Sequence, residues 1–308
     1  MKKINRLTRL AGIAFSCALF SNLIFASTFT LPASGNSIIG NIKYTEAPGD
    51  FTPNVSHHYN VGQNALLVAN PDIVENVSLP KATLTIPTVY MLPPLPRKGI
   101  VINLPEMRMY YYPPGTNTVM TFPIGIGRIG KTIPLANAKI TRKVVNPTWT
   151  PPDDIREFNR NQGIKLPKKM GPGPDNPLGP YAIYLTIPTY LIHSTIFPES
   201  IGRRASFGCI RMNEDDIKQF FPLVEPGTQV SIIDMPYKVA WNGNHLYLEA
   251  HPPLEEKKHE EHATLDGVVK AIQAQIPSQD IVLVNWQLVS YLADNPDGIP
   301  HEVGVKVN

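Results

Sequence analysis

Proline is the residue type that most restricts what this chain can fold into. The 308 residues include 32 Pro against 21 Gly, about twice the usual share of proline. Because proline lacks a backbone N–H and its ring clashes with the preceding helical turn, this composition disfavours an all-helical protein and favours strands, turns and stiff connections. Hydrophobic residues make up 43% of the chain, which excludes a wholly disordered protein. The length suffices for roughly two domains of ordinary size.

The first 26 residues have the pattern of an export signal. Four basic residues and no acid lie within the first nine positions, and an apolar run follows from Leu10 to Ala26. This pattern predicts a secretory signal that is cleaved after Ala26, and the alternative is an uncleaved anchor. Without these residues the chain has 24 basic and 25 acidic residues, a net charge of −1. We therefore expect no nucleic-acid partner and, after cleavage, no membrane span.

Only one cysteine, Cys209, lies outside the export signal, because Cys17 falls within it. A lone thiol in an exported chain indicates a reactive thiol or an intermolecular pair. His193 stands 16 positions earlier, after an apolar run typical of a strand. An imidazole can take the proton that a thiol must lose before it acts as a nucleophile. Taken alone, His193 would more often be a core histidine, so its assignment depends on the motifs around it.

The rest of the chain divides into three regions. Residues 97–235 alternate strand patterns with short turns, which predicts a mainly β, sandwich-like or barrel-like domain. Its segment from residue 146 to residue 179 is rich in Pro, Gly and charge and predicts a functional loop. Residues 40–96 form a small unit of mixed pattern. Residues 236–308 form a C-terminal extension.

The C-terminal extension contains a charge run and two helical patterns. Residues 255–262 read EEKKHEEH, which is typical of a solvated linker or a helix end. Apolar residues recur at helical spacing from Leu265 to Ile276. Asp280 is expected to cap a second helix that continues to Leu292. We interpret both helices as packing elements that flank the β structure.

The small unit at residues 40–96 has several recognisable segments. Gly49-Asp50 stands near its start, Asn70-Pro71 follows an apolar run, and an alternating strand pattern ends at Ile86-Pro87. The unit resembles an α/β LysM module, with a strand, two short helices around an Asn-Pro turn, and a closing strand. The resemblance implies binding of N-acetylglucosamine-containing glycans such as peptidoglycan. The alternative is a structural cap without affinity for glycan.

Several short motifs surround His193 and Cys209 in a fixed order. They are Asn146 to Pro152 (NPTWTPP), Gly171-Pro172, Asn176 to Gly179, Ile192 to Thr195, and Ser206 to Met212 (SFGCIRM). Together they resemble the active-site signature of L,D-transpeptidases with a YkuD-type catalytic domain, over about residues 97–240. The complete layout resembles the exported, LysM-containing subgroup of Gram-negative bacteria. This resemblance implies a periplasmic location.

The resemblance implies catalytic roles for four residues. Cys209 is then the nucleophile and His193 its base, and the backbone carbonyl of Ser194 holds the tautomer of His193. Backbone N–H groups of Gly208 and Cys209 are expected to stabilise the oxyanion of the tetrahedral intermediates.

Substrate contacts are expected from Arg211, Trp149, Ser206 and Phe207. Arg211 either binds a stem carboxylate or forms an ion pair with Asp215 or Asp216. Trp149 either lines the donor groove or braces the long segment. The family usually has histidine where Phe207 stands. Because a phenyl ring has no proton to exchange, Phe207 cannot transfer protons.

The expected substrate is a peptidoglycan tetrapeptide stem. The resemblance implies attack on the amide between meso-diaminopimelate and the terminal D-Ala, release of D-Ala, and transfer of the acyl group from the thioester to an amine. The acceptor is a second stem, an outer-membrane protein, or water. The alternative from another class is a peptidoglycan-binding protein whose catalytic domain has decayed. No cofactor is expected, and no metal, because the histidines lack the spacing of a zinc site.

Overall fold

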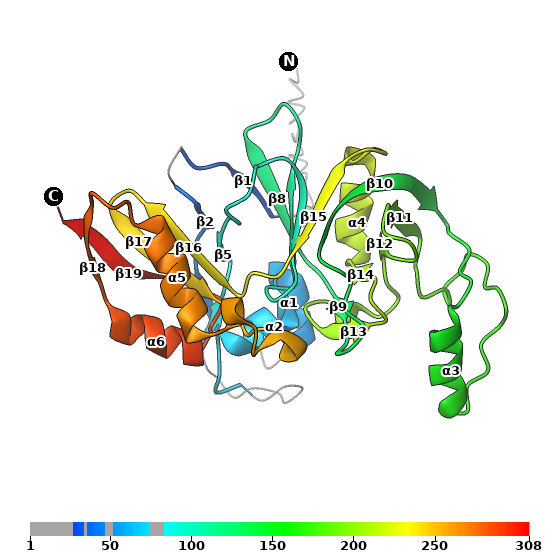
Figure 1. The fold of residues 1–308 in the computed structure, drawn as a ribbon. Coiled ribbons are helices and arrows are strands. Elements are labelled where there is room, and N and C mark those ends of the chain that lie inside the picture. The colour runs from blue at the N-terminus through cyan, green and yellow to red at the C-terminus, as the bar shows by residue number, and fades with distance from the viewer. Residues whose placement is uncertain (1–26, 34–35, 47–51, 74–82, 308) are drawn as a thin grey trace, which may run out of the picture.

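The structure, a computed structural model, describes residues 27–33, 36–46, 52–73 and 83–307. Within these ranges the chain is mainly β with flanking helices, as the sequence predicted (Figure 1). The export signal and the Gly49-Asp50 motif lie outside the described residues. Among the residues that are described, no helix combines the length and apolar character needed to cross a bilayer.

Nine strands form one curled sheet at the centre of the molecule. Gly125 and Arg211 exchange two backbone hydrogen bonds of 2.9 Å, and these bonds join the chain just after β8 to the far edge strand, β14. The two ends of the sheet thus meet around one apolar core, to which β8 contributes Phe122 and β12 contributes Ile192. The order across the sheet is β1 (Ser27–Thr30), β8 (Thr118–Pro123), β7 (Arg108–Tyr112), β6 (Gly99–Asn103), β15 (Gln229–Ile233), β10 (Ala136–Val145), β11 (Tyr181–Leu185), β12 (Leu191–His193) and β14 (Ile210–Arg211).

Four smaller elements accompany this sheet. β9 (Ile126–Gly127) pairs in parallel with β13 (Arg204–Ser206). α4 (Glu214–Phe220) places Ile217 and Phe220 in the core. α3 (Asp153–Asn161) lies in the long segment, stands apart from the sheet and has no buried residue (Figure 1).

The unit that resembles LysM contains β3 (Lys43–Glu46), α1 (Thr52–Tyr59), α2 (Gln63–Val68) and β4 (Thr83–Ile86), with β3 and β4 antiparallel. The Asn70 amide donates to the carbonyls of Leu66 and Thr85 at 2.8 and 2.7 Å. Because Asn70 thus bonds the last turn of α2, both helices precede the Asn-Pro turn. Residues 74–82, which follow the turn, lie outside the described residues, so the expectation of a helix on each side of the turn stays a prediction.

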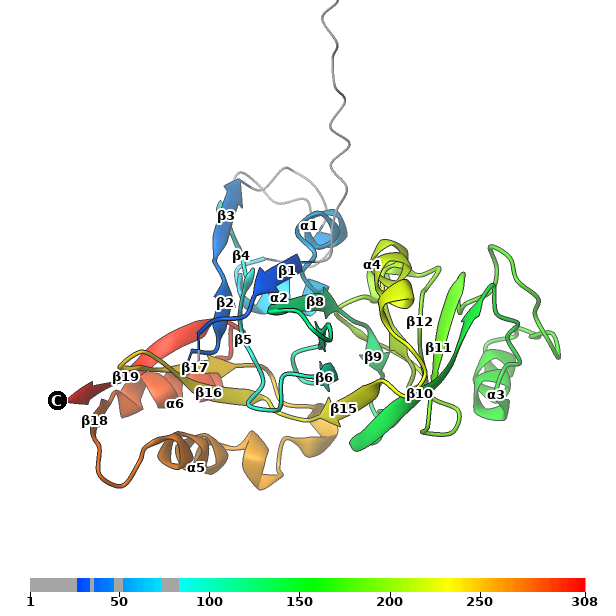
Figure 2. The ribbon, with the colours of Figure 1, turned by 90° about the horizontal axis from the view of Figure 1, so that it is seen from above.

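This unit is docked against the catalytic half of the chain (Figure 2). The backbone N–H of Asn64 donates to the carbonyl of Gly202 at 3.1 Å, and Arg203 donates to the side chain of Gln63 at 2.6 Å. The Asn60 amide donates to the buried carboxylate of Asp216 at 3.3 Å. A second connection comes from β2 (Ile38–Gly40) and β5 (Val89–Met91), which pair and pack beside the main sheet.

The C-terminal extension is a folded unit with its own apolar core. Its sheet has the order β16 (Tyr237–Asn242), β17 (His245–Ala250), β19 (Pro300–Val307) and β18 (Ile281–Val284), with α5 (Leu265–Gln275) and α6 (Trp286–Asp294) beside it. The first predicted helix is confirmed as α5. The prediction that Asp280 caps the second was wrong, since β18 intervenes and the Asn285 side chain accepts from Leu288 N at 3.0 Å. The β-branched and apolar run of β18 pairs with β19, which outweighs the helical pattern.

The charge run at residues 255–262 is exposed for the most part, as expected, but it is ordered in two short 3₁₀ turns. Glu256 also forms an ion pair with Arg204 at 2.7 Å. The run therefore attaches the C-terminal unit to the catalytic half.

Candidate active site

The parallel pairing of β12 with β14 brings the predicted histidine and cysteine to one face of the sheet. Ile192 is opposite Ile210, and His193 is opposite Arg211. Both isoleucines point into the main core. Because side chains alternate along a strand, His193 and Arg211 point to the other face, and Cys209, one step before Ile210, shares it.

His193 is buried and has one ring nitrogen assigned by its surroundings. Nδ1 contacts the backbone carbonyl of Ser194, and since a carbonyl only accepts, Nδ1 must carry the proton. Nε2 is then left to act as a base. Burial, and secondarily the charge of Arg211, lower the pKa of His193 to about 4. The imidazole is therefore neutral at neutral pH.

The Ser194 side chain braces the strand that carries the histidine. Its hydroxyl donates to the carbonyl of Leu178 at 2.9 Å and accepts from the Tyr181 N–H at 3.1 Å. The expected backbone contact to His193 is also present. Ser194 therefore ties His193 to the end of the long segment.

Cys209 carries a half-buried free thiol that packs near Leu178 and Leu191. Sγ lies 3.8 Å from the carbonyl of Thr189. Burial raises the pKa of the Cys209 thiol, while the Leu191 N–H and Arg211 partly offset this effect. The site thus holds an uncharged thiol and a neutral imidazole, and a thiol must lose its proton to a base before it can act as a nucleophile.

The turn before Cys209 is closed by Ser206. The Ser206 hydroxyl donates to the Cys209 carbonyl at 2.6 Å and accepts from the Gly208 N–H at 3.0 Å. Gly208 has φ +119°, and a Cβ there would lie 2.6 Å from a ring carbon of Tyr190. The Gly208 N–H is therefore occupied, contrary to its expected role as an oxyanion donor. In the described part of the turn, the N–H of Cys209 has no hydrogen-bond partner and can still serve this role.

Arg211 does not form the ion pair that was one of its two expected roles. The side chain of Asp216 instead accepts from Asn60 and Asn213, each at 3.3 Å. The Arg211 guanidinium lies over the Phe197 ring, 5.5 Å from its centroid, and its buried Nε has no partner among the described residues.

Comparison with known proteins agrees with this geometry. The family profile of YkuD, an L,D-transpeptidase catalytic domain, matches residues 97–232. "Probable L,D-transpeptidase YcfS" of Escherichia coli K12 is 40% identical over 285 residues, which cover 90% of this chain and 88% of that protein. This chain belongs to the L,D-transpeptidase family.

Other relatives cover the chain to a similar extent. "Probable L,D-transpeptidase YbiS" of Escherichia coli K12 is 39% identical over 81% of this chain and 83% of its own length. "Probable L,D-transpeptidase ErfK/SrfK" of Salmonella typhimurium is 40% identical over 80% and 81%. An NMR structure of the catalytic domain of the Enterococcus faecium L,D-transpeptidase is 23% identical, covers 46% of this chain and 99% of that domain, and has a TM-score of 0.35.

Trp149 braces the long segment, which is one of the two roles expected of it in this L,D-transpeptidase. Its backbone exchanges two hydrogen bonds of 2.8 Å with Met170, which closes the base of the long segment. Its ring packs in the same apolar cluster as Leu178 and Cys209. It therefore braces the segment and borders the nucleophile.

Phe207 lies in an aromatic stack that sequence analysis missed. Its ring contacts Phe158 of α3 edge-on, with centroids 5.2 Å apart. The Arg128 guanidinium carbon lies 3.5 Å from the Phe207 centroid and 4.1 Å from that of Phe158. No sequence pattern pointed to Arg128 or Phe158, because they lie far from Phe207 along the chain.

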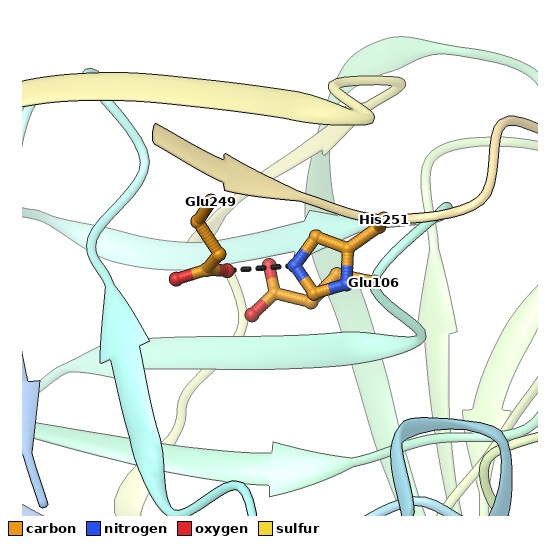
Figure 3. A group of neighbouring side chains, drawn as sticks. All are labelled: Glu106, Glu249 and His251. Carbon is orange, nitrogen blue, oxygen red and sulfur yellow. Dashed lines mark hydrogen bonds and ion pairs between the residues drawn. The ribbon is translucent and has the colours of Figure 1, made fainter. Parts of the chain in front are cut away.

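A buried cluster of side chains, away from the face that bears His193 and Cys209, has the residue types of a metal site. Glu106, Glu249 and His251 can bring their ligand atoms within 4.8 Å of one another (Figure 3). The Lys238 ammonium, however, lies 2.9 Å from Glu106 and 2.6 Å from Glu249. It supplies the positive charge that these carboxylates need, so we assign the group a structural role.

Proposed function

We propose that this L,D-transpeptidase acts on peptidoglycan tetrapeptide stems through a thioester at Cys209. The observation that carries the proposal is the tautomer of His193. Its Nδ1–H donates to the Ser194 carbonyl, so Nε2 is the ring nitrogen without a proton, and the pairing of β12 with β14 puts His193 on the face that bears the Cys209 thiol.

The reaction begins when Nε2 of His193 takes the thiol proton as sulfur attacks the carbonyl carbon between diaminopimelate and D-Ala. The oxyanion of the tetrahedral intermediate accepts a hydrogen bond from the N–H of Cys209. As the C–N bond breaks, His193 returns the proton to the amino group of the departing D-Ala. An acceptor amine then attacks the thioester and loses a proton to His193. As the new amide forms, the C–S bond breaks and His193 returns the proton to the Cys209 sulfur.

Three acceptors fit this scheme. A second stem gives a 3→3 cross-link, a side chain of an outer-membrane protein gives a tethered protein, and water gives hydrolysis. The unit that resembles LysM would hold the enzyme on the glycan, and the export signal would place it in the periplasm.

Mass spectrometry of the purified enzyme with isolated tetrapeptide muropeptides tests the proposal. We expect loss of D-Ala and a new dimeric product, and Cys209→Ala should produce neither while retaining the folded circular-dichroism spectrum. A carbapenem should add its mass to the wild-type protein and not to Cys209→Ala. Turnover by Cys209→Ala would reject the thioester mechanism.

The second candidate is a peptidoglycan-binding protein with a decayed catalytic domain. The observation in its favour is Phe207, since the family usually has histidine there. It predicts no product from the wild-type protein in the same assay.

A further inference from the structure

The guanidinium of Arg128 is held beside the catalytic turn in a way that leaves its hydrogen-bonding edge free. Its two flanking rings, Phe207 and Phe158, lie 3.5 and 4.1 Å from the guanidinium carbon. Their planes are inclined at 75° to one another, so the two rings contact the side chain from different directions. The backbone N–H of Arg128 also donates to the Ser206 carbonyl at 3.0 Å.

Within the described ranges, no hydrogen bond or ion pair involves the Arg128 guanidinium. Other arginines near the site differ in this respect. Arg204 donates two hydrogen bonds to Glu256, each 2.7 Å long, and Arg156 donates to the carbonyls of Pro151 and Lys168. The contacts of Arg128 with its rings use the face of the planar group, whereas its N–H donors point outward in the plane.

Local charge also favours an anion at this position. The nearby acid, Asp154 of α3, already forms an ion pair with Lys131 at 2.6 Å. The charge of Arg128 is therefore not paired with a carboxylate of the protein. Its donors match the two oxygens of a carboxylate on a ligand.

We propose that Arg128 binds a carboxylate of the donor stem peptide, and that Phe207 and Phe158 orient it for that contact. This inference rests on the proposed function. Phe207 precedes Cys209 by two residues, a span of at most about 7 Å along an extended chain. The carboxylates of D-Ala and diaminopimelate both lie within one residue of the bond that Cys209 attacks.

In this proposal Phe207 orients the Arg128 guanidinium. A phenyl ring holds the guanidinium by its face and makes no hydrogen bond of its own, so it leaves the donors of Arg128 for substrate. Phe158 comes from α3, which has no buried residue, contacts the catalytic turn through this stack and is also held by the ion pair of Asp154 with Lys131. Docking of α3 therefore completes the carboxylate site.

Steady-state kinetics with three synthetic tetrapeptides test the proposal. One is unmodified, one is amidated at the D-Ala carboxyl, and one is amidated at the diaminopimelate side-chain carboxyl. Arg128→Gln should raise KM for the unmodified donor by about 10- to 100-fold and change kcat little, which is the range for a charge-assisted hydrogen bond. In the wild type, one amidation should cause a similar rise, and Arg128→Gln should be insensitive to that same amidation.

Matched variants separate this role from general effects of charge and folding. Arg160→Gln removes the same charge from the exposed side of α3 and should leave KM unchanged. Arg128→Lys keeps the charge without the two-pronged geometry, and Phe158→Leu removes one ring; both should give intermediate KM values. Binding of a fluorescent tetrapeptide to Cys209→Ala, with and without Arg128→Gln, provides the same comparison without turnover.

The proposal is overturned if Arg128→Gln binds the unmodified donor as tightly as wild type does. It is also overturned if Arg128→Gln remains as sensitive to both amidations as the wild type. A wild-type protein without turnover would reject the proposed function and leave the binding comparison decisive for Arg128.

Discussion

At the scale of single residues, the site depends on a neutral pair. Burial lowers the pKa of His193 and raises that of Cys209, so neither group is charged at rest. An ion pair of thiolate and imidazolium would require the opposite shifts. In the proposed mechanism, the proton therefore moves from Cys209 to His193 only as sulfur attacks the substrate.

The acid side of the pH–rate profile should reflect the burial of His193. A base works only when unprotonated, so acylation should rise as pH increases through about 4, the pKa of buried His193, and not through the ordinary value near 6.5. Stopped-flow or quenched intact-mass kinetics with a carbapenem measures the limb. His193→Ala should slow acylation by roughly 10²–10⁴-fold and remove this pH dependence. A limb near 6.5 would show that the imidazole is hydrated in solution.

Phe207 provides a second test at the same scale. Phe207→His should react within about tenfold of wild type, or about 1.4 kcal/mol of barrier, because an imidazole ring can still pack under Arg128. Phe207→Gly should react more slowly, since it removes the stacked ring and frees the turn before Gly208. All three proteins are assayed on one tetrapeptide donor. An inactive wild type that regains turnover with Phe207→His would instead support the decayed-enzyme alternative.

At the scale of elements, the segment between His193 and Cys209 contacts the unit that resembles LysM and joins it to the catalytic half. Gly202 lies in it with φ +73°, and a Cβ there would stand 2.3 Å from the Gln63 nitrogen and 2.4 Å from Cα of Gly62. The N-terminal end of α2 is thus packed directly on the segment that leads to the nucleophile. This close approach is possible only because both residues are glycine.

Gly202→Ala should therefore loosen the docking of α1 and α2. We expect a loss of about 1–3 kcal/mol beyond that of Gly130→Ala, because overpacking adds to the cost of positive φ. Gly130 is the matched control, with φ +75° and no atom within 4 Å of an added Cβ. Urea unfolding gives the difference, and limited proteolysis locates it. Equal stability of the two variants would contradict the tight junction.

At the scale of the whole molecule, one buried charge group joins three parts of the chain. Lys238 from the C-terminal unit contacts Glu106 beside the main sheet, Glu249 of β17, and the Met91 carbonyl of β5 at 2.6 Å. Burial acts to raise the pKa of Glu106, but Lys238, His251 and Arg108 outweigh it and lower that pKa to about 2. Deletion of residues 40–96 would remove Met91 from this group, so it would disturb more than glycan binding.

Lys238→Met should destabilise the protein by about 3–5 kcal/mol at pH 7, because it leaves two buried carboxylates without their cation. The depressed pKa of Glu106 means that its contribution is present above about pH 4.5 and is lost as pH falls toward 2. The difference between Lys238→Met and wild type should therefore shrink at pH 4. Urea unfolding at both pH values measures it.

The matched control for this prediction is Lys270→Met on α5, which breaks an exposed ion pair with Glu261. It should cost less than about 1 kcal/mol at either pH. A comparable cost for the two lysines would show that the buried group contributes no more than a surface ion pair.

The sequence by itself determined which chemistry the chain can carry. The lone Cys209, the turn motif around it and the histidine at a strand end are local features, as are the alternating patterns that predicted a mainly β fold. They can be recognised in the sequence because each depends only on residue types and spacing within a few positions. The second C-terminal helix shows the limit of this reasoning, since a partner strand, β19, decided that residues 281–284 pair as β18.

Only the tertiary structure decided which of these groups remain free to act. Pairing of β12 with β14 places Arg211 opposite His193, and the Ser206 hydroxyl occupies the N–H of Gly208. The turn at Phe207 meets Arg128 and α3 only when the long segment folds back on it. Periodicity predicts the face on which a side chain lies but not the neighbour it meets there, because that neighbour comes from a distant part of the chain and is fixed by packing.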